Sequence, residues 1–124
     1  MTADVSIRNA TKVFGAFRAL DAVSLEIAAG EFIVLRGPSG CGKTTLLSIL
    51  GGFIEPSAGT IAIGGKDMTH VEPAKRPTTT MFQDYALFPH MKLIDNVGFG
   101  LRMRGLGKAE RNEKALAMLD LVGL

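Results

Sequence analysis

The 124-residue sequence predicts an α/β fold, with strands in the first two thirds of the chain and helices in the last third. Apolar residues alternate near the start, a short apolar run leads into a glycine-rich loop, and apolar residues recur at helical spacing towards the end. The composition agrees, because 47% of the residues are apolar and 21% are charged, as in an ordinary globular chain. Glycine is abundant, with 15 residues and no fixed repeat, which indicates local roles in turns and loops.

Three strands are predicted before the glycine-rich loop. Val5 and Ile7 alternate with polar neighbours, which is the period of a half-buried strand, and residues 23–27 show the same pattern. Residues 32–35 form a short apolar run, typical of a strand that is buried on both faces. This third strand leads directly to Gly37.

After the loop, leucines at helical spacing predict a helix over residues 44–50, and the glycines at 51–52 are typical of a C-terminal cap. Further strands are predicted at 60–63, followed by a glycine turn, and at 78–82, after a proline-bounded loop.

Two more helices are predicted, over residues 94–104 and 108–122. The second places Ala115, Leu119 and Val122 on one face, which predicts its packed side. No repeat, low-complexity segment or linker marks a domain boundary.

Charge and hydropathy exclude several classes of protein. Fourteen Lys and Arg residues against twelve Asp and Glu leave a net charge of +2, so basicity gives no argument for a nucleic-acid partner, and we expect none. The longest uncharged apolar run, residues 46–54, is far shorter than the roughly 20 residues that span a bilayer. Asp4 and Arg8 stand where a secretory signal needs apolar residues, so we expect a cytoplasmic protein.

Residues 37–44, Gly-Pro-Ser-Gly-Cys-Gly-Lys-Thr, carry the strongest functional signal. They match the pattern G-x-x-x-x-G-K-[ST] of a phosphate-binding loop, between a predicted strand and a predicted helix. Glycines let the backbone approach phosphate oxygens, Lys43 supplies a cation for the β- and γ-phosphates, and Thr44 supplies a hydroxyl for Mg²⁺. We therefore expect a nucleoside triphosphate with Mg²⁺. The predicted binding residues are Gly37, Ser39, Gly40, Cys41, Gly42, Lys43, Thr44 and Thr45.

Other residues are candidates for chemistry of their own. A thiol at the position of Cys41 can act as a nucleophile, but the sequence places no histidine or asparagine partner beside it. We interpret it as a small residue that fits a crowded loop. His70 and His90 have no Cys or Glu cluster around them, so we interpret both as loop residues rather than metal ligands.

Several further stretches carry a family resemblance. They are Leu20–Ile27 with Gly30–Phe32, Leu46–Phe53, Ser57–Ile61 and Met81–Met91. On these stretches the chain resembles the N-terminal part of the ATP-binding subunit of an ABC transporter. The last of them is similar to the family's Q-loop, which separates this family from the kinases and GTPases that share the first motif. The resemblance implies a P-loop NTPase fold of the ABC ATPase type, with an N-terminal antiparallel β subdomain, the start of a helical subdomain and an incomplete core sheet.

The resemblance also assigns roles. Phe14 falls where the family places an aromatic that stacks on adenine, the alternative being a core phenylalanine. Gln83 offers its side-chain oxygen to Mg²⁺, beside Thr44, and to the attacking water, so that Lys43 and Gln83 are the candidate catalytic residues. The segment from Tyr85 to Arg104 lies where a membrane permease subunit docks.

At the level of the whole protein, the resemblance implies a β subdomain and P-loop core at 1–92 and the start of a helical subdomain at 93–124. It further implies a homodimer or heterodimer of ATP-binding subunits, peripheral on the inner face of the cell membrane. Pro73–Pro77 and residues 96–103 look like importers of polyamines such as spermidine and putrescine, with ferric-iron and sugar importers as alternatives.

The family's remaining catalytic parts, an LSGGQ-type signature, a strand ending in Asp then Glu and a switch histidine, are absent from these 124 residues. We therefore expect this chain alone to bind ATP and to lack hydrolysis. Two alternatives stay open: a non-enzymatic module that binds nucleotide or docks on a permease, and another P-loop enzyme such as a kinase.

Overall fold

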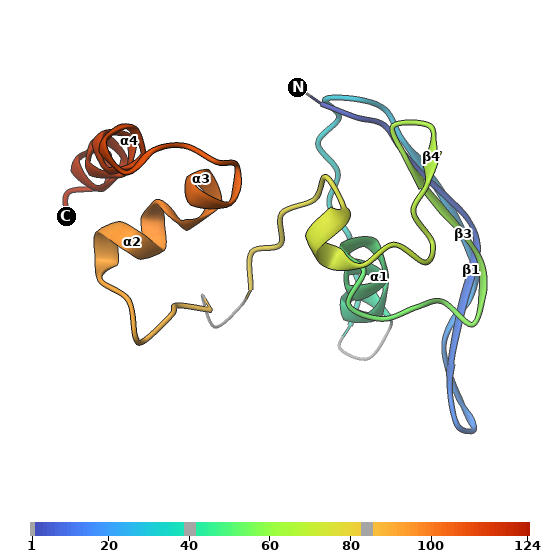
Figure 1. Cartoon of the computed structure of the whole chain (residues 1–124). Coiled ribbons are helices and arrows are strands. Elements are labelled where there is room, and N and C mark those ends of the chain that lie inside the picture. The colour runs from blue at the N-terminus through green and yellow to red at the C-terminus, as the bar shows by residue number, and fades with distance from the viewer. Residues whose placement is uncertain (1, 39–41, 83–85) are drawn as a thin grey trace. The chain divides into compact units, whose positions relative to one another are not determined.

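The computed structural model describes residues 2–38, 42–82 and 86–124. The chain forms two compact units, Met1–Thr80 and Met81–Leu124. The strands of the described residues lie in the first unit together with one α-helix, and the second unit is helical (Figure 1). The subdomain division expected between residues 92 and 93 stays a prediction.

The first unit is built on a four-stranded antiparallel sheet with the order β2-β1-β3-β4. Its strands are β1 (Val5–Phe14), β2 (Phe17–Ile27), β3 (Ala58–Ile63) and β4 (Lys66–Asp67). β1 and β2 form a hairpin, and β1 pairs on its other side with β3, so that Ile7 lies between Leu25 and Ile61. The strands predicted from the alternation near the start, and the strand at 60–63, are confirmed.

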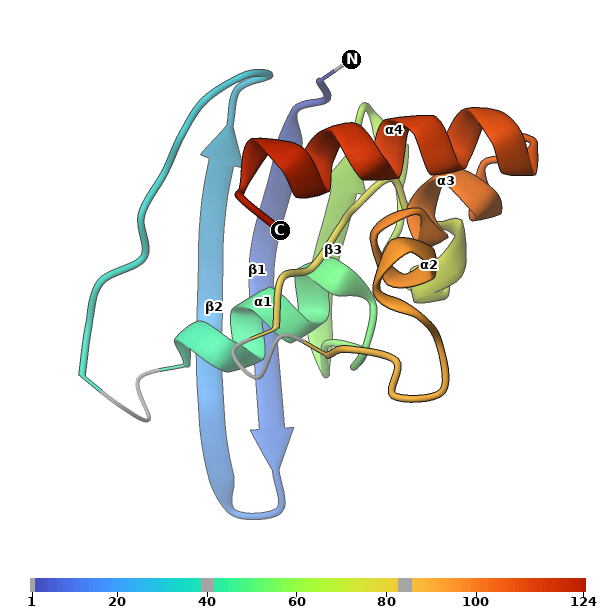
Figure 2. The same cartoon turned by 90° about the vertical axis from the view of Figure 1, so that its left-hand side faces the viewer.

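Helix α1 (Lys43–Gly51) lies against one face of this sheet (Figure 2). Leu46 and Ile49 are buried and belong to the same core cluster as Ile61 of β3. Full burial of a side chain such as Ile49 contributes roughly 1.5–3 kcal/mol to folding. The helix ends at Gly52, whose left-handed conformation (φ +82°) lets its N–H bond back to the Ile49 carbonyl. The predicted helix and its glycine cap are confirmed.

Two of the predicted strands are wrong. Residues 32–35 and 78–82 form no strand, and Phe32 and Met81 are 89% and 93% exposed. A strand needs a neighbour for its backbone N–H and C=O groups, and no strand of the described residues pairs with either segment. Between β4 and residue 78 the proline-bounded loop contains a short 3₁₀ helix, η1 (Pro73–Lys75).

The second unit contains α2 (Leu93–Val97), α3 (Phe99–Met103) and α4 (Lys108–Leu121). The single helix predicted over 94–104 is in fact two, because Gly98 ends α2 and begins α3. Ala115 and Leu119 of α4 are buried as predicted, whereas Val122 lies beyond the helix and is exposed. None of the helices in the described ranges is long and apolar enough to cross a bilayer.

Candidate nucleotide-binding site

The N-terminal end of α1 is shaped by Gly42, its N-cap residue. The backbone at Gly42 is left-handed (φ +98°), a conformation that L-residues with a side chain rarely adopt. A Cβ atom there would also lie 2.6 Å from the Ala19 carbonyl oxygen and 2.8 Å from Leu20 Cδ2. Both conditions require glycine, so the last glycine of the motif lets the loop approach β2 closely enough for α1 to begin there.

Lys43 joins the two ends of the phosphate-binding loop. Its Nζ donates a hydrogen bond to the Gly37 carbonyl, so that the first residue of the motif and its lysine lie together. This contact keeps the ammonium group of Lys43 beside the loop. An anion bound by the loop would therefore have a cation next to it.

The first turn of α1 offers further donors. Within the described residues, α1 has no side-chain cap and no acidic residue in this turn. Its first N–H groups have no acceptor inside the helix, as at any helix start. Thr44 is exposed and Thr45 is half-buried. Backbone N–H groups, an ammonium and a hydroxyl form the donor set that fits a phosphate with a Mg²⁺ ion.

Part of the predicted site cannot be placed. Ser39, Gly40, Cys41 and Gln83 lie outside the described residues, and so does Tyr85 at the start of the expected docking segment. The structure thus brings together Gly37, Gly42 and Lys43 with the two threonines of α1. The binding, metal and catalytic roles of the site residues stay predictions.

Phe14 ends β1, at the tip of the β1–β2 hairpin. Its side chain is 48% exposed, so it is not a core residue of the sheet. Lys12 Nζ lies 5.3 Å from the centroid of its ring, a cation–π distance. The exposure leaves the ring able to stack on a planar ligand, and its role towards adenine stays a prediction.

A groove of about 610 Å³ runs beside α1. It is lined mostly by apolar side chains of β2, of residues 33–35 and of α1, with Lys43 and Thr44 as its polar members. An apolar lining does not suit a triphosphate, so this groove does not support a phosphate site along it, and the loop stays the predicted site.

The C-terminal end of α1 is held by an arginine that the sequence analysis did not single out. Arg76 follows η1 and is buried. Its Nη1 donates to the carbonyls of Ile49 (2.8 Å) and Leu50 (3.1 Å), at the end of α1. Burial lowers the pKa of Arg76, and the charge of Glu55 acts in the opposite direction. Nothing in the sequence separates this arginine from an exposed loop arginine, because its burial depends on carbonyls that only the fold brings to it.

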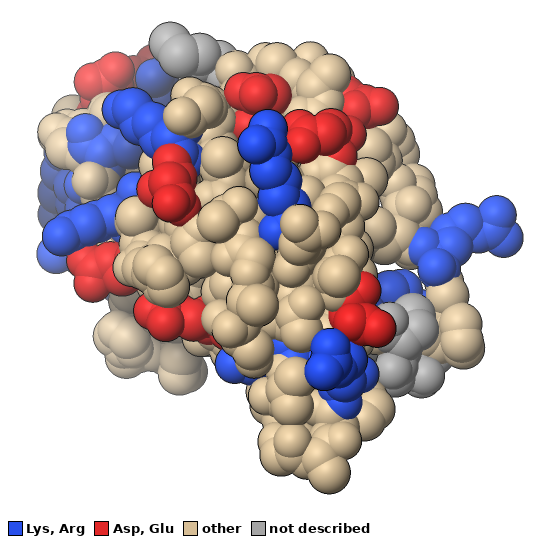
Figure 3. Space-filling view, turned by 90° about the vertical axis from the view of Figure 1, so that its right-hand side faces the viewer, with Lys and Arg blue, Asp and Glu red and all other residues tan. Residues whose placement is uncertain are grey.

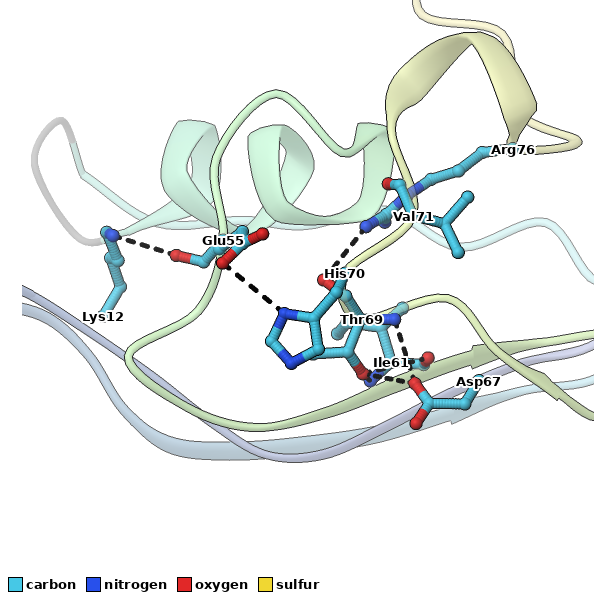
Figure 4. A network of polar contacts seen from close by, with 8 residues as sticks. All are labelled: Lys12, Glu55, Ile61, Asp67, Thr69, His70, Val71 and Arg76. Atoms are coloured by element: carbon cyan, nitrogen blue, oxygen red, sulfur yellow. Dashed lines mark hydrogen bonds and ion pairs between the residues drawn. The ribbon is translucent and has the colours of Figure 1, made fainter.

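Thr69 links this arginine to the sheet (Figure 4). The Thr69 carbonyl accepts a hydrogen bond from Arg76 Nη2 (3.3 Å), and its buried hydroxyl accepts one from the Ile61 N–H (2.9 Å). The same hydroxyl donates to Asp67 Oδ1 (2.6 Å). Hydrogen bonds from the Thr69 side chain and backbone hold the pKa of Asp67 below its ordinary value. The loop after β4 is therefore fastened to β3 by polar contacts.

The outer face of the sheet, turned away from α1, carries acidic and basic side chains mixed together (Figure 3). Arg8 and Glu26, one ion pair of this face, are exposed and 3.8 Å apart. Exposed pairs of this kind contribute about 0–1 kcal/mol, so this pair adds little to the stability of the sheet.

In the second unit, Asn96 organises the segment before α2. Its Oδ1 accepts a hydrogen bond from the Phe88 N–H (2.8 Å), and its Nδ2 donates to the carbonyls of Phe88, Met91 and Lys92 at 3.1–3.2 Å. The ring of Phe88 packs on Phe99 with centroids 4.7 Å apart. Around this ordered segment several large apolar side chains are exposed. They are Leu87, Leu93, Val97 and Met103.

Helix α1 begins at a glycine and follows a G-x-x-x-x-G-K-[ST] motif, and the lysine of the motif bonds back to the first glycine of the motif. These features define a P-loop nucleotide-binding protein. The sequence model of the family described as ABC transporter matches residues 20–124. The chain therefore belongs to the ABC transporter family, and the resemblance seen in its motifs is confirmed.

Among curated relatives, the chain is 53% identical over 120 residues to the "Spermidine/putrescine import ATP-binding protein PotA" of Marinobacter nauticus, covering 94% of this chain and 32% of that protein. It is 52% identical over 120 residues to the "Fe(3+) ions import ATP-binding protein FbpC" of Agrobacterium fabrum, covering 97% of this chain and 34% of the relative. The chain thus spans about a third of the length of these relatives.

The solved structures agree with this family. The ATP-binding cassette MJ0796, in a dimeric post-hydrolysis state bound to ADP and Pi, matches with a TM-score of 0.82 at 30% identity, over 97% of this chain and 57% of the other. The expected fold class, that of an ABC ATPase, is confirmed by this match and by the antiparallel sheet with its helices.

Proposed function

We propose that this chain binds ATP with Mg²⁺ and serves as the energy-coupling, ATP-binding part of an ABC importer. The observation that carries the proposal is the start of α1, where Gly42 occupies a position that admits no side chain and Lys43 reaches back to Gly37. Backbone N–H groups at a helix start with a lysine ammonium beside them fit an anion with several oxygens.

The roles follow from donor chemistry. Lys43 and the first N–H groups of α1 hold the β- and γ-phosphates, and Thr44 with Gln83 holds Mg²⁺. Phe14 stacks on adenine, which its exposure supports. When bound, Mg²⁺ neutralises phosphate charge, which Lys43 does from the protein side.

The transported substrate is proposed to be a polyamine, because relatives named as spermidine/putrescine importers match at 53% and 55% identity. Ferric iron is the alternative, since the relative named for it is 52% identical.

The exposed apolar side chains around Asn96 support a permease-docking role for residues 85–104, and the dimeric match supports a dimer of ATP-binding subunits. Such a protein lies on the cytoplasmic face of the membrane.

The proposal is tested by titrating MgATP into the protein in a calorimeter, with Lys43→Ala as the variant and Lys66→Ala, an exposed lysine of β4, as the control. We expect saturable binding that weakens at least about tenfold in Lys43→Ala, a loss of about 1.4 kcal/mol, and is unchanged in the control. Absence of saturable binding by the wild type would refute nucleotide binding. Steady phosphate release by the 124-residue polypeptide, abolished in Lys43→Ala, would contradict the expected loss of hydrolysis.

A further inference from the structure

Arg76 makes an unusual set of contacts for a loop arginine. Besides the two carbonyls of α1, its Nε donates to the Val71 carbonyl (2.8 Å) and its Nη2 to the Thr69 carbonyl (3.3 Å). One buried guanidinium thus bonds four backbone carbonyls, two at the end of α1 and two in the segment that follows β4. Figure 4 shows the second pair, at Thr69 and Val71, beside Arg76. All the acceptors are backbone groups, so this contact fixes the path of the chain rather than pairing one charge with another.

The end of α1 is shaped to receive this side chain. A Cβ atom on Gly52 would lie 2.6 Å from Arg76 Nε and 3.0 Å from its Cζ. Gly52 therefore leaves the space that the guanidinium occupies, in addition to ending the helix in a left-handed conformation. The fit indicates a specific contact, because removing a charged group from water is unfavourable unless its donors are satisfied.

The other side of the contact is anchored in the sheet. Thr69 is held by hydrogen bonds from β3 and to Asp67 of β4, so the carbonyls that meet Arg76 have a fixed position. The guanidinium is thus a rigid connection from β3 to the C-terminal end of α1. A helix of nine residues is about 13 Å long at ~1.5 Å per residue, and it moves as one body. A contact that fixes its last turn also fixes where its first turn lies.

We propose that Arg76 is a positioning residue for the nucleotide site: by holding the last carbonyls of α1 to the segment after β4, it sets the axial position of α1 and so places Lys43 and the first N–H groups for the triphosphate. This inference rests on the proposed nucleotide binding. It differs from a purely stabilising role, in which a folded variant would bind MgATP as well as the wild type.

The test uses the 124-residue chain with Arg76→Met, Arg76→Lys and the control Arg8→Met, which removes an exposed arginine of the sheet. We expect Arg76→Met to weaken MgATP binding about tenfold in calorimetry, as small misplacements of binding groups do. Arg76→Lys recovers part of the loss, because the lysine ammonium reaches the Ile49 and Leu50 carbonyls of α1 but not the two carbonyls after β4 as well. Circular dichroism confirms the fold of each variant, and Arg8→Met binds as the wild type does.

Amide hydrogen exchange tells whether Arg76 positions the whole of α1 or holds only its last turn. The Leu46 N–H bonds to Gly42 in the first turn, and the Gly52 N–H bonds to Ile49 at the other end. Positioning predicts faster exchange at both amides in Arg76→Met, whereas a local role accelerates Gly52 alone.

Wild-type affinity and unchanged Leu46 exchange in a folded Arg76→Met would overturn the inference while leaving nucleotide binding intact. If Arg76→Met does not fold, unchanged affinity in Arg76→Lys overturns it instead. Failure of the wild type to bind MgATP refutes the proposed function itself.

Discussion

Replacing Gly42 by alanine tests the geometry of the loop most directly. Two effects add at this position: a left-handed backbone, unfavourable for alanine by about 1–2 kcal/mol, and a Cβ atom 2.6 Å from the Ala19 carbonyl oxygen. The second forces backbone to move, and overpacking of this kind costs about 1–3 kcal/mol. We expect Gly42→Ala to lower the free energy of unfolding by about 2–5 kcal/mol.

Gly30→Ala is the matched control, because Gly30 is also left-handed (φ +77°) but has nothing within 4 Å of an added Cβ. It isolates the backbone effect, with an expected loss of about 1–2 kcal/mol. Urea unfolding of the 124-residue chain, followed by circular dichroism, measures both variants. If Gly42→Ala were no more destabilising than Gly30→Ala, the close contact with Ala19 would carry no weight and the requirement for glycine would be conformational only.

Two further predictions concern charge and order. The pKa of Asp67 is lowered in the folded protein from its ordinary 3.8, so its contribution to stability is complete at pH values above 3.8 and is lost as the pH falls from there through the folded pKa. The difference in urea midpoint between wild type and Asp67→Asn therefore shrinks between pH 7 and pH 3, and a constant difference would contradict this. Asn96→Ala removes the side-chain acceptor of the exposed Phe88 N–H and destabilises residues 88–92 by about 0.5–1.5 kcal/mol for that hydrogen bond, seen as faster exchange of the Phe88 amide. Unchanged exchange there would show that the ring contact with Phe99 suffices.

The elements predicted correctly from the sequence depend on local pattern. β1, β2 and β3 follow from alternation, and α1 follows from leucine spacing between a Gly-Lys-Thr start and a Gly-Gly end. These patterns work because each element packs one face against the same core.

The two wrong strands depend on partners instead. An apolar run such as 32–35 indicates which residues can be buried, but a strand exists only where another strand accepts its hydrogen bonds. The break at Gly98 is of the same kind. A Cβ there would lie 3.7 Å from Ala115 Cβ of α4, a contact that no local pattern encodes.

The site residues also divide into those that a local pattern predicts and those that depend on the fold. The loop residues were predicted because a fixed spacing encodes the phosphate-binding geometry, and Gly37, Gly42 and Lys43 lie together in the structure. Arg76 was missed, since its site is made by two pairs of carbonyls, at 49–50 and at 69 and 71, that only the fold brings together.

The same arginine changes the electrostatic character of α1. A helix carries roughly half a negative charge at its C-terminal end, which opposes the attraction of anions to its other end. The full positive charge of Arg76 lies within 3.1 Å of two of those terminal carbonyls and outweighs that half charge. The arginine therefore offsets the negative end of the α1 dipole, so an anion at the first turn meets less opposition from the far end of the helix.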